Sequence, residues 1–141
     1  MSGFLLDTNF ISELVRPRPE PRVMGWLDSV DESLLYLSVL TLGEIRKGLA
    51  GLSHGKRRLH LESWLDVELQ TRFSGRTLPV DAAVANRWGL LAAQAKSRGR
   101  PLPVIDGLLA ATALQYNLTV VSRNASDFAN TRVPVINPWD A

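Results

Sequence analysis

The sequence has 141 residues, 45% of them apolar and 21% charged, which excludes intrinsic disorder as the main state and leaves no room for a second sizeable core. It has no cysteine, so disulfides, thiolate metal sites and cysteine nucleophiles are excluded. The net charge is only +2, although thirteen of the sixteen basic residues are arginines. That bias permits a nucleic-acid partner, and a GC-rich genome produces it too. We expect one domain over residues 1–141.

The sequence offers no targeting or membrane segment. The N-terminal apolar run is interrupted at Asp7, so it is far too short for the hydrophobic part of a signal peptide. No run approaches the roughly 20 apolar residues that span a bilayer. We therefore expect a cytoplasmic protein without a membrane partner.

The first half of the chain alternates short apolar runs with amphipathic segments. Gly3 to Asp7 is an apolar run that ends on an acid, which predicts a short buried strand. Thr41 and Glu44 match a capping box, which predicts the start of a helix after the second strand. The other predicted elements of this half are helical turns at 9–15, a proline-rich break at 16–21, a helix at 23–28 and a strand at 34–39.

The second half predicts three helices and two further strands. Apolar residues recur every four positions from 61 to 73, which predicts an amphipathic helix. Asp81 can cap a further helix, and Gly99 can end it. The remaining predicted elements are an extended piece at 78–80, a small-residue helix beginning at Asp106, a strand at 118–122 and an edge strand at 133–136. Strands that alternate with helices predict an α/β domain with a mostly parallel sheet.

Acidic and amide side chains follow the predicted strands. Asp7 ends the first strand, Glu44 follows the second, and Asp106 begins the small-residue helix, while Asn124 and Asp127 come after the strand at 118–122. Parallel strands gather such side chains at one edge of the sheet. Carboxylates without cysteine make an oxygen site that suits Mg²⁺, with Mn²⁺ as a substitute. A divalent cation relieves their mutual repulsion, activates a water and neutralises charge on a phosphodiester.

Each of these acids also has a structural explanation when it is considered alone. Glu44 completes the capping box, Asp106 can be a helix N-cap, Asp7 can be a turn residue, and Asp127 can be a solvated loop acid. Considered singly, these structural explanations are favoured. The joint arrangement of the acids reverses that preference.

Four motifs resemble those of PIN-domain proteins, in the family's order and spacing and over nearly the whole chain. They are Leu5-Leu6-Asp7-Thr8-Asn9, Ser38-x-x-Thr41-x-x-Glu44, Asp106-Gly107-x-x-Ala110-Ala111-Thr112-Ala113, and Val120-Val121-Ser122-Arg123-Asn124-x-x-Asp127-Phe128. Two further segments, Ile11-Ser12-Glu13 and Asn137-Pro138-Trp139, are similar to the VapC and FitB-like toxins of bacteria.

The resemblance implies a three-layer α/β/α fold and a magnesium-dependent endoribonuclease, the toxin of a type II toxin–antitoxin system. Metal-activated water would attack an RNA phosphodiester and leave a 3′-hydroxyl and a 5′-phosphate. Asp7, Glu44 and Asp106 would carry the metal, with Asp7 and Asp106 as direct ligands. The implied catalytic set also contains Asn124 and Asp127. The implied supporting hydroxyls are Thr8 and Ser122.

The chain departs from the family at its fourth acid. Many members have aspartate where this chain has Asn124, a neutral and poorer ligand. Asp127, three residues later, can substitute, or the fourth position binds only water. This departure puts a second metal ion in doubt more than the first.

The resemblance also implies partners. An antitoxin encoded alongside would cover the acidic site with its C-terminal segment, in a groove near Ile11, Leu14 and Leu49. The chain would form a homodimer or a larger complex with the antitoxin and would reach operator DNA only through it. The alternative is a catalytically inactive module that acts with its antitoxin on DNA. A receiver or dehalogenase-like phosphotransfer domain ranks last, because Asp7-Thr8-Asn9 lacks the second aspartate of the dehalogenase motif.

Other conspicuous residues have simpler predicted roles. His54 and His60 are six apart, which is not a helical zinc-ligand spacing, and we expect them on the surface. Arg46 and Arg123 are candidates for contact with phosphate. The run Lys56-Arg57-Arg58 either is a solvated helix start or contacts RNA, and we slightly favour solvation. We expect core or dimer-interface positions for Trp26, Trp64 and Trp88.

Overall fold

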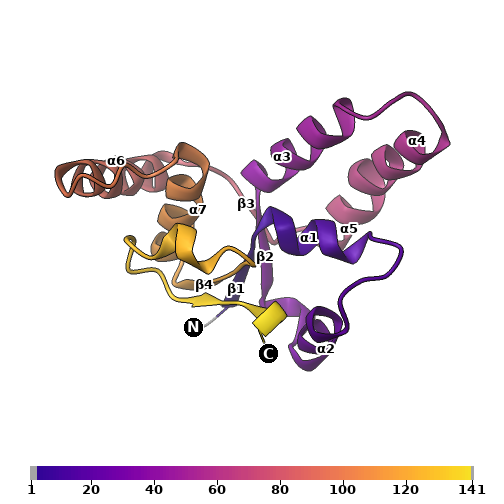
Figure 1. The fold of residues 1–141 in the computed structure, drawn as a ribbon, viewed down its shortest axis with the longest axis horizontal. Coiled ribbons are helices and arrows are strands. Elements are labelled where there is room, and N and C mark those ends of the chain that lie inside the picture. Colours follow the sequence, from indigo (N-terminus) through magenta and orange to yellow (C-terminus); the bar gives the residue numbers. More distant parts are fainter. Residues whose placement is uncertain (1–2, 141) are drawn as a thin grey trace.

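The computed structural model describes residues 3–140, which form a five-stranded sheet with helices on both faces (Figure 1). The strand order is β3-β2-β1-β4-β5, and every neighbouring pair is parallel. The predicted parallel sheet is therefore confirmed, and β5 lies at its edge as expected. The strands are β1 (Gly3–Leu6), β2 (Leu35–Ser38), β3 (Thr77–Leu78), β4 (Leu118–Val121) and β5 (Val135–Ile136).

The helices alternate with the strands along the chain. The α-helices are α1 (Thr8–Leu14), α2 (Pro21–Ser29), α3 (Val39–Ala50), α4 (Lys56–Ser63), α5 (Gln70–Arg72), α6 (Ala82–Ser97) and α7 (Val104–Gln115). Shorter helical elements are the 3₁₀ turns η1 (Glu32–Leu34), η3 (Ala125–Phe128) and η4 (Pro138–Asp140) and a π-helical segment, η2 (Trp64–Leu69). No helix among the described residues is long and apolar enough to cross a membrane.

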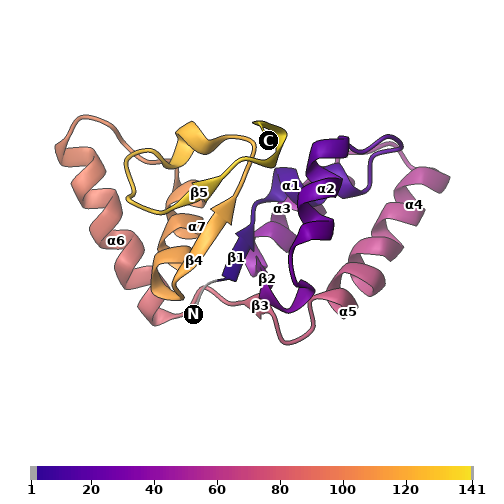
Figure 2. The ribbon, with the colours of Figure 1, turned by 90° about the horizontal axis from the view of Figure 1, so that it is seen from below.

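Two hydrophobic cores, one on each face of the sheet, make this a three-layer α/β/α fold, as predicted. Successive strand residues point to opposite faces, so Leu6 and Val121 enter one core while Leu5 and Val120 enter the other. The first core packs α1, α2, α3 and η2 against the sheet, and the second packs α7. Figure 2 shows the two groups of helices on opposite sides of β1.

The starts of two helices differ from the sequence prediction. Helix α3 begins at Val39, and Ser38 is its N-cap, with its hydroxyl accepting from the Leu40 amide at 3.0 Å. The predicted capping box is therefore wrong, because Thr41 already lies inside the helix and is buried. Helix α2 begins at Pro21, inside the predicted break, because proline suits the first helical position, which needs no amide donor.

The apolar stripe from 61 to 73 does not lie on one regular helix. It runs through the end of α4, the π-helical segment η2 and α5. Leu65, Leu69 and Phe73 are nevertheless buried in the first core. The stripe therefore predicted which side chains are buried but not the change in helical pitch that brings them there.

The carboxyl ends of the two central strands are held in close register. Gly3 to Leu6 of β1 pair with Leu118 to Val121 of β4, and the Asp7 amide donates to the Val121 carbonyl at 2.9 Å. Gly3 is needed for this approach, because a Cβ there would lie 2.9 Å from the Leu118 side chain and 3.0 Å from the Leu34 carbonyl oxygen. The residues after both strands, Asp7 and Ser122, consequently meet.

Candidate active site

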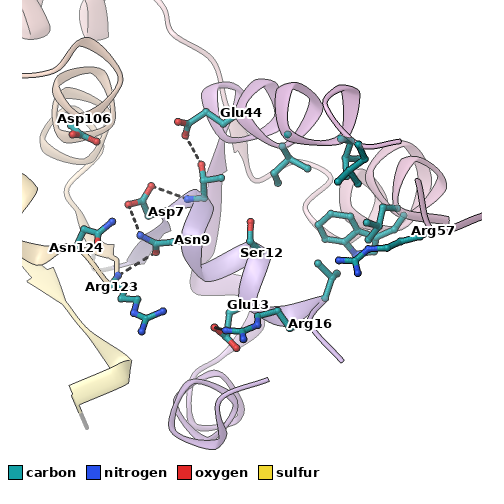
Figure 3. Close-up of a pocket in the computed structure, with 18 of the residues that line it drawn as sticks. Asp7, Asn9, Ser12, Glu13, Arg16, Glu44, Arg57, Asp106, Arg123 and Asn124 are labelled. Atoms are coloured by element: carbon teal, nitrogen blue, oxygen red, sulfur yellow. Dashed lines mark hydrogen bonds and ion pairs between the residues drawn. The ribbon is translucent and has the colours of Figure 1, made fainter. Parts of the chain in front are cut away.

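A cavity of about 710 Å³ opens at the carboxyl edge of the sheet. Five acidic side chains line it. Four of them come from four segments, namely Asp7 after β1, Glu44 on α3, Asp106 on α7 and Asp127 on η3, and the fifth, Glu13 on α1, is paired with Arg16. Thr8 and Asn124 line it too, whereas the predicted supporting residue Ser122 is buried behind it. Figure 3 shows Asp7 between Glu44 on one side and Asp106 on the other. The expected convergence of acids at one sheet edge is present in the structure.

Asp7 is held in place by donors from its own helix and from β4. As the N-cap of α1, it accepts a hydrogen bond from the Thr8 amide at 2.8 Å. Its other oxygen accepts from the buried Ser122 hydroxyl at 2.8 Å and from the Asn9 amide group at 3.4 Å. Burial raises the pKa of Asp7, and these donors, which favour the carboxylate, oppose that rise. The Asp7 carboxylate is therefore fixed in orientation across two strands.

Glu44 is oriented through a hydroxyl on the neighbouring helix. The Thr8 hydroxyl donates to a Glu44 carboxylate oxygen at 2.5 Å and lies 3.3 Å from the Thr41 hydroxyl. Thr8 thus couples Glu44 to Asp7, because its amide contacts one carboxylate and its hydroxyl the other. Sequence reasoning gave Thr8 a supporting role but placed Thr41 in a capping box. The repeated hydroxyl spacing, Ser38-x-x-Thr41, was the available signal.

Asp106 differs from Asp7 because no hydrogen-bond donor among residues 3–140 reaches its carboxylate. It lies in the first turn of α7, where Pro103 is the N-cap, so the alternative explanation of Asp106 as an N-cap is wrong. Desolvation, followed by the negative charges of Asp127, Asp7 and Glu44, raises the pKa of Asp106 to about 6. An ionised Asp106 is therefore poorly compensated by the protein itself, and a cation would stabilise it.

The donor set fits a hard divalent cation held partly by solvent. All the available charged ligands are carboxylate oxygens, which Mg²⁺ and Mn²⁺ prefer. Within residues 3–140, no group of three or more His, Cys, Asp or Glu side chains is arranged to surround one ion. Mg²⁺ does not need such a cage, because it commonly takes one or two carboxylates and completes its shell with waters and phosphate oxygens. Asp7 and Asp106 suit that pattern.

Asn9 links two parts of the cavity lining, which we call the acidic floor (Asp7, Glu44, Asp106 and Asp127) and the basic rim (Arg57 and Arg123). The Asn9 amide nitrogen donates to Asp7 and to the Ser122 hydroxyl at 3.2 Å, while its oxygen accepts from the Arg123 amide at 3.2 Å (Figure 3). The Arg123 side chain lines the cavity and lies over the ring of the buried Trp139. The first motif contains Asn9, but the sequence alone predicts no role for it, because a single sequence does not reveal which strand its side chain would reach.

Away from the acids, the cavity extends along an apolar wall. Its apolar lining is Val15, Ile45, Leu49, Leu52, Leu61 and Trp64, from α1, α3, α4 and their flanks. The predicted groove near Leu49 is therefore present. Ile11 and Leu14 do not line it: Ile11 is fully buried in the first core, and Leu14 packs against that core. The period of the short helix α1 turns both residues inward.

Several other predicted residues lie elsewhere. Arg46 is not a lining residue and is paired with Asp66, so it has no place in this cavity. Arg57 lines the cavity, whereas Arg58 pairs with Glu62.

The histidines and the tryptophans differ in their exposure. The surface positions of His54 and His60 are confirmed. Trp26 and Trp64 pack against the first core, and Trp88 is half-buried beside α7.

Comparison with known proteins identifies relatives over nearly the whole chain. Residues 4–133 match the PIN domain family. Toxin FitB of Neisseria gonorrhoeae is 43% identical over 135 residues, which cover 96% of this chain and 97% of FitB. VapC ribonuclease Y4jK of Sinorhizobium fredii is 39% identical over 136 residues, covering 96% and 97% of the two chains.

Solved structures agree with these sequence relatives. The crystal structure of FitAcB from Neisseria gonorrhoeae superposes with a TM-score of 0.92 and 42% identity, and the match covers 98% of this chain and 99% of that one. A structure of FitAB bound to an IR36 DNA fragment superposes with a TM-score of 0.90 and 41% identity, covering 96% and 95%. This chain thus shares its fold with a chain of the FitAcB and FitAB structures.

Proposed function

The chain belongs to the PIN-domain family, close to the FitB and VapC toxins, and we propose that it is an endoribonuclease that depends on Mg²⁺ or Mn²⁺. The observation that carries this proposal is the set of four carboxylates in one open cavity, of which Asp106 lacks any donor among the described residues. The relative Y4jK is named a ribonuclease. We propose the cytoplasm as its place of action.

In this proposal Asp7 and Asp106 hold the cation directly, and Glu44 completes the acidic set. When bound, a divalent cation neutralises phosphate charge and lowers the pKa of water, which makes hydrolysis accessible at neutral pH. Ser122 and Asn9 keep the Asp7 carboxylate pointed into the cavity, while Thr8 orients Glu44. Asn124 and Asp127 line the cavity from the segment after β4 and complete the polar surface around the substrate phosphate.

The basic residues at the rim supply the contacts that an acidic floor lacks. Arg57 and Arg123 line the same cavity from opposite elements and can bind RNA phosphates that flank the scissile bond. The Asn9 bond to the Arg123 backbone fixes that segment against Asp7. In this arrangement the arginines position the RNA backbone, and the carboxylates act on a single phosphodiester linkage.

We also propose a cognate antitoxin as the physiological partner. FitAB and FitAcB are complexes, and FitAB was solved with DNA, which supports a partner chain that carries the DNA contact. The apolar wall from Ile45 to Trp64 suits the docking of a peptide whose basic residue enters the acidic floor. A homodimer within such a complex is part of the same proposal.

A second candidate function is a regulatory module that acts on operator DNA with its antitoxin but does not cleave RNA. The FitAB–DNA structure favours considering it. The intact acidic set favours catalysis, because docking of an antitoxin needs negative charge but not carboxylates held in fixed orientations by Thr8 and Ser122.

The deciding experiment is cleavage of total RNA by the purified 141-residue chain. We expect cleavage with 5 mM Mg²⁺, none with EDTA, and restoration on adding Mn²⁺. Asp106→Asn should be inactive, while Asp28→Asn, an exposed acid outside the cavity, should match the wild type. Cleavage that persists undiminished in EDTA would refute the metal-dependent mechanism. An inactive wild type that still binds operator DNA with its antitoxin would favour the second candidate.

A further inference from the structure

A second cavity, of about 250 Å³, lies between α6, the end of α7 and the loop after η3. Three arginines line it, Arg87 on α6, Arg98 directly after α6 and Arg132 from the loop, and no acidic residue does. The rest of its lining is Gln94, Asn130 and Thr131, which are polar, and Leu90, Leu91 and Leu114, which are apolar. The net charge of this lining is therefore positive, whereas that of the acidic cavity is negative.

Within residues 3–140 none of these three arginines forms an ion pair, whereas six of the other arginines do. The ion pairs among residues 3–140 engage arginines 16, 22, 46, 58, 72 and 76, and none engages Arg87, Arg98 or Arg132. The Arg87 Nε atom donates to the Gln115 side chain at 3.2 Å, which orients its guanidinium and leaves the terminal nitrogens available. Exposed, unpaired guanidiniums around one hollow form a site for an anion.

The loop that carries Arg132 is held in a strained conformation. Arg132 has a φ of 62°, in the left-handed region that non-glycine residues seldom adopt. The buried Thr131 maintains this turn, because its hydroxyl donates to the Phe128 carbonyl at 2.7 Å and accepts from the Val133 amide at 3.4 Å. Strain that the surrounding structure maintains is a feature of functional loops. Here it presents an arginine at the cavity.

The same short segment borders both cavities. Asn124 and Asp127 line the acidic cavity, and Asn130 to Arg132 line the basic one. Helix α7 also connects them, since Asp106 lies in its first turn and Leu114 near its end. Eight residues of helix correspond to a rise of about 12 Å. An extended nucleic-acid strand can therefore reach from one cavity to the other.

We propose that this basic cavity binds the phosphodiester backbone of the RNA substrate, outside the linkage that is cleaved. The inference rests on the proposed ribonuclease function. Arginine forks bind phosphate oxygens in pairs, which suits a backbone contact. The cavity has no aromatic side chain on which a base could stack, so the contact is independent of base sequence. Its role is to increase affinity for long substrates.

The test compares binding of two single-stranded RNAs, of 20 and 4 nucleotides with the same 5′ sequence, by fluorescence anisotropy. Ca²⁺ replaces Mg²⁺ to prevent turnover. In the variant Arg87→Gln/Arg98→Gln/Arg132→Gln, affinity for the 20-mer should fall by about tenfold or more. The slope of log K against log salt should become shallower by about 2, at about 0.7 for each of three phosphates. Binding of the 4-mer should be unchanged.

Two further variants separate this role from net charge and from folding. Arg18→Gln/Lys47→Gln/Lys96→Gln removes three exposed cations that line neither cavity, and 20-mer affinity should change less than threefold. Arg132→Gly relieves the left-handed backbone, so its midpoint of thermal unfolding should be unchanged or higher while 20-mer affinity falls. A loss of binding together with a gain in stability is not expected from a merely structural arginine.

Several outcomes would overturn the proposal. Equal 20-mer affinity and salt slope in the wild type and the triple glutamine variant would refute the backbone contact. A change of oligomeric state in that variant, measured by light scattering, would assign the cavity to a subunit interface instead. Competition by micromolar inorganic phosphate or mononucleotide would indicate a small-ligand site. Total RNA left uncleaved by the wild type would count against the proposed function alone, because the anisotropy arms do not depend on turnover.

Discussion

Replacing Asp106 by asparagine should raise the stability of the metal-free protein at neutral pH. The pKa of Asp106 is raised to about 6 from 3.8, because desolvation and three neighbouring carboxylates disfavour its charged form. The native state therefore holds the proton more tightly than the unfolded state. Ionised Asp106 consequently lowers the free energy of unfolding above pH 6, and this cost disappears as the pH falls toward 3.8.

The expected magnitude follows from that shift. About two pKa units correspond to about 3 kcal/mol, at about 1.4 kcal/mol per unit. Asp106 is half-buried, so solvent screening reduces the effect, and we expect a gain of about 1 to 2 kcal/mol for Asp106→Asn at pH 7.5. Near pH 4.5 the gain should shrink to a few tenths of a kcal/mol, because Asp106 of the folded wild type is then mostly protonated and uncharged.

Urea unfolding of both proteins in EDTA, at pH 7.5, 6.0 and 4.5, measures this difference. Asp28→Asn, which removes an exposed acid on α2 outside the cavity, is the matched control and should show no such trend. Added Mg²⁺ should stabilise the wild type more than Asp106→Asn. A stability difference that stays constant across the three pH values would refute the electrostatic explanation.

The other predictions concern the residues around the acids. Asp7→Asn should fold and lose cleavage by a thousandfold or more, whereas Asn124→Ala should lose less, as a coupled RNA assay would show. Thr8→Val should reduce the rate by about tenfold to a hundredfold and Thr8→Ser should restore it, since only the hydroxyl bond is removed. Gly107→Ala should cost about 1 to 3 kcal/mol in urea unfolding, because the new Cβ would lie 2.9 Å from Trp88, and Trp88→Leu should recover part of it.

The sequence was sufficient to predict the layers and the edge of the sheet at which the acids meet. Buried parallel strands read as short apolar runs, and the residues that follow them necessarily reach the same edge. Asp7 after β1 and Asn124 after β4 therefore line one cavity, as expected. That prediction depended on strand direction alone, which the alternation of strands and helices determines.

The sequence was not sufficient to predict which polar groups pair. Thr8 and Glu44 are 36 positions apart and meet because α1 packs on α3, which depends on the shapes of both helices. The capping box at Thr41 failed for a related reason: Ser38 is an equally good cap one turn earlier, and the length of β2 decides between them. Local sequence preference is compatible with a helix start at either Ser38 or Thr41, and the tertiary structure determines that the helix begins after Ser38.

The proposed activation by a metal ion and the proposed inhibition by an antitoxin depend on the same uncompensated negative charge in the cavity. The acidic floor gathers Asp7, Glu44, Asp106 and Asp127 in one cavity, and among residues 3–140 hydrogen-bond donors reach only the first two side chains. The uncompensated charge on the Asp106 side of the cavity can be neutralised by a divalent cation or by a basic side chain from a partner. The proposed antitoxin and the metal should therefore compete. Raising Mg²⁺ should weaken antitoxin binding to the wild type more than to Asp106→Asn, and equal effects on both would refute a shared site.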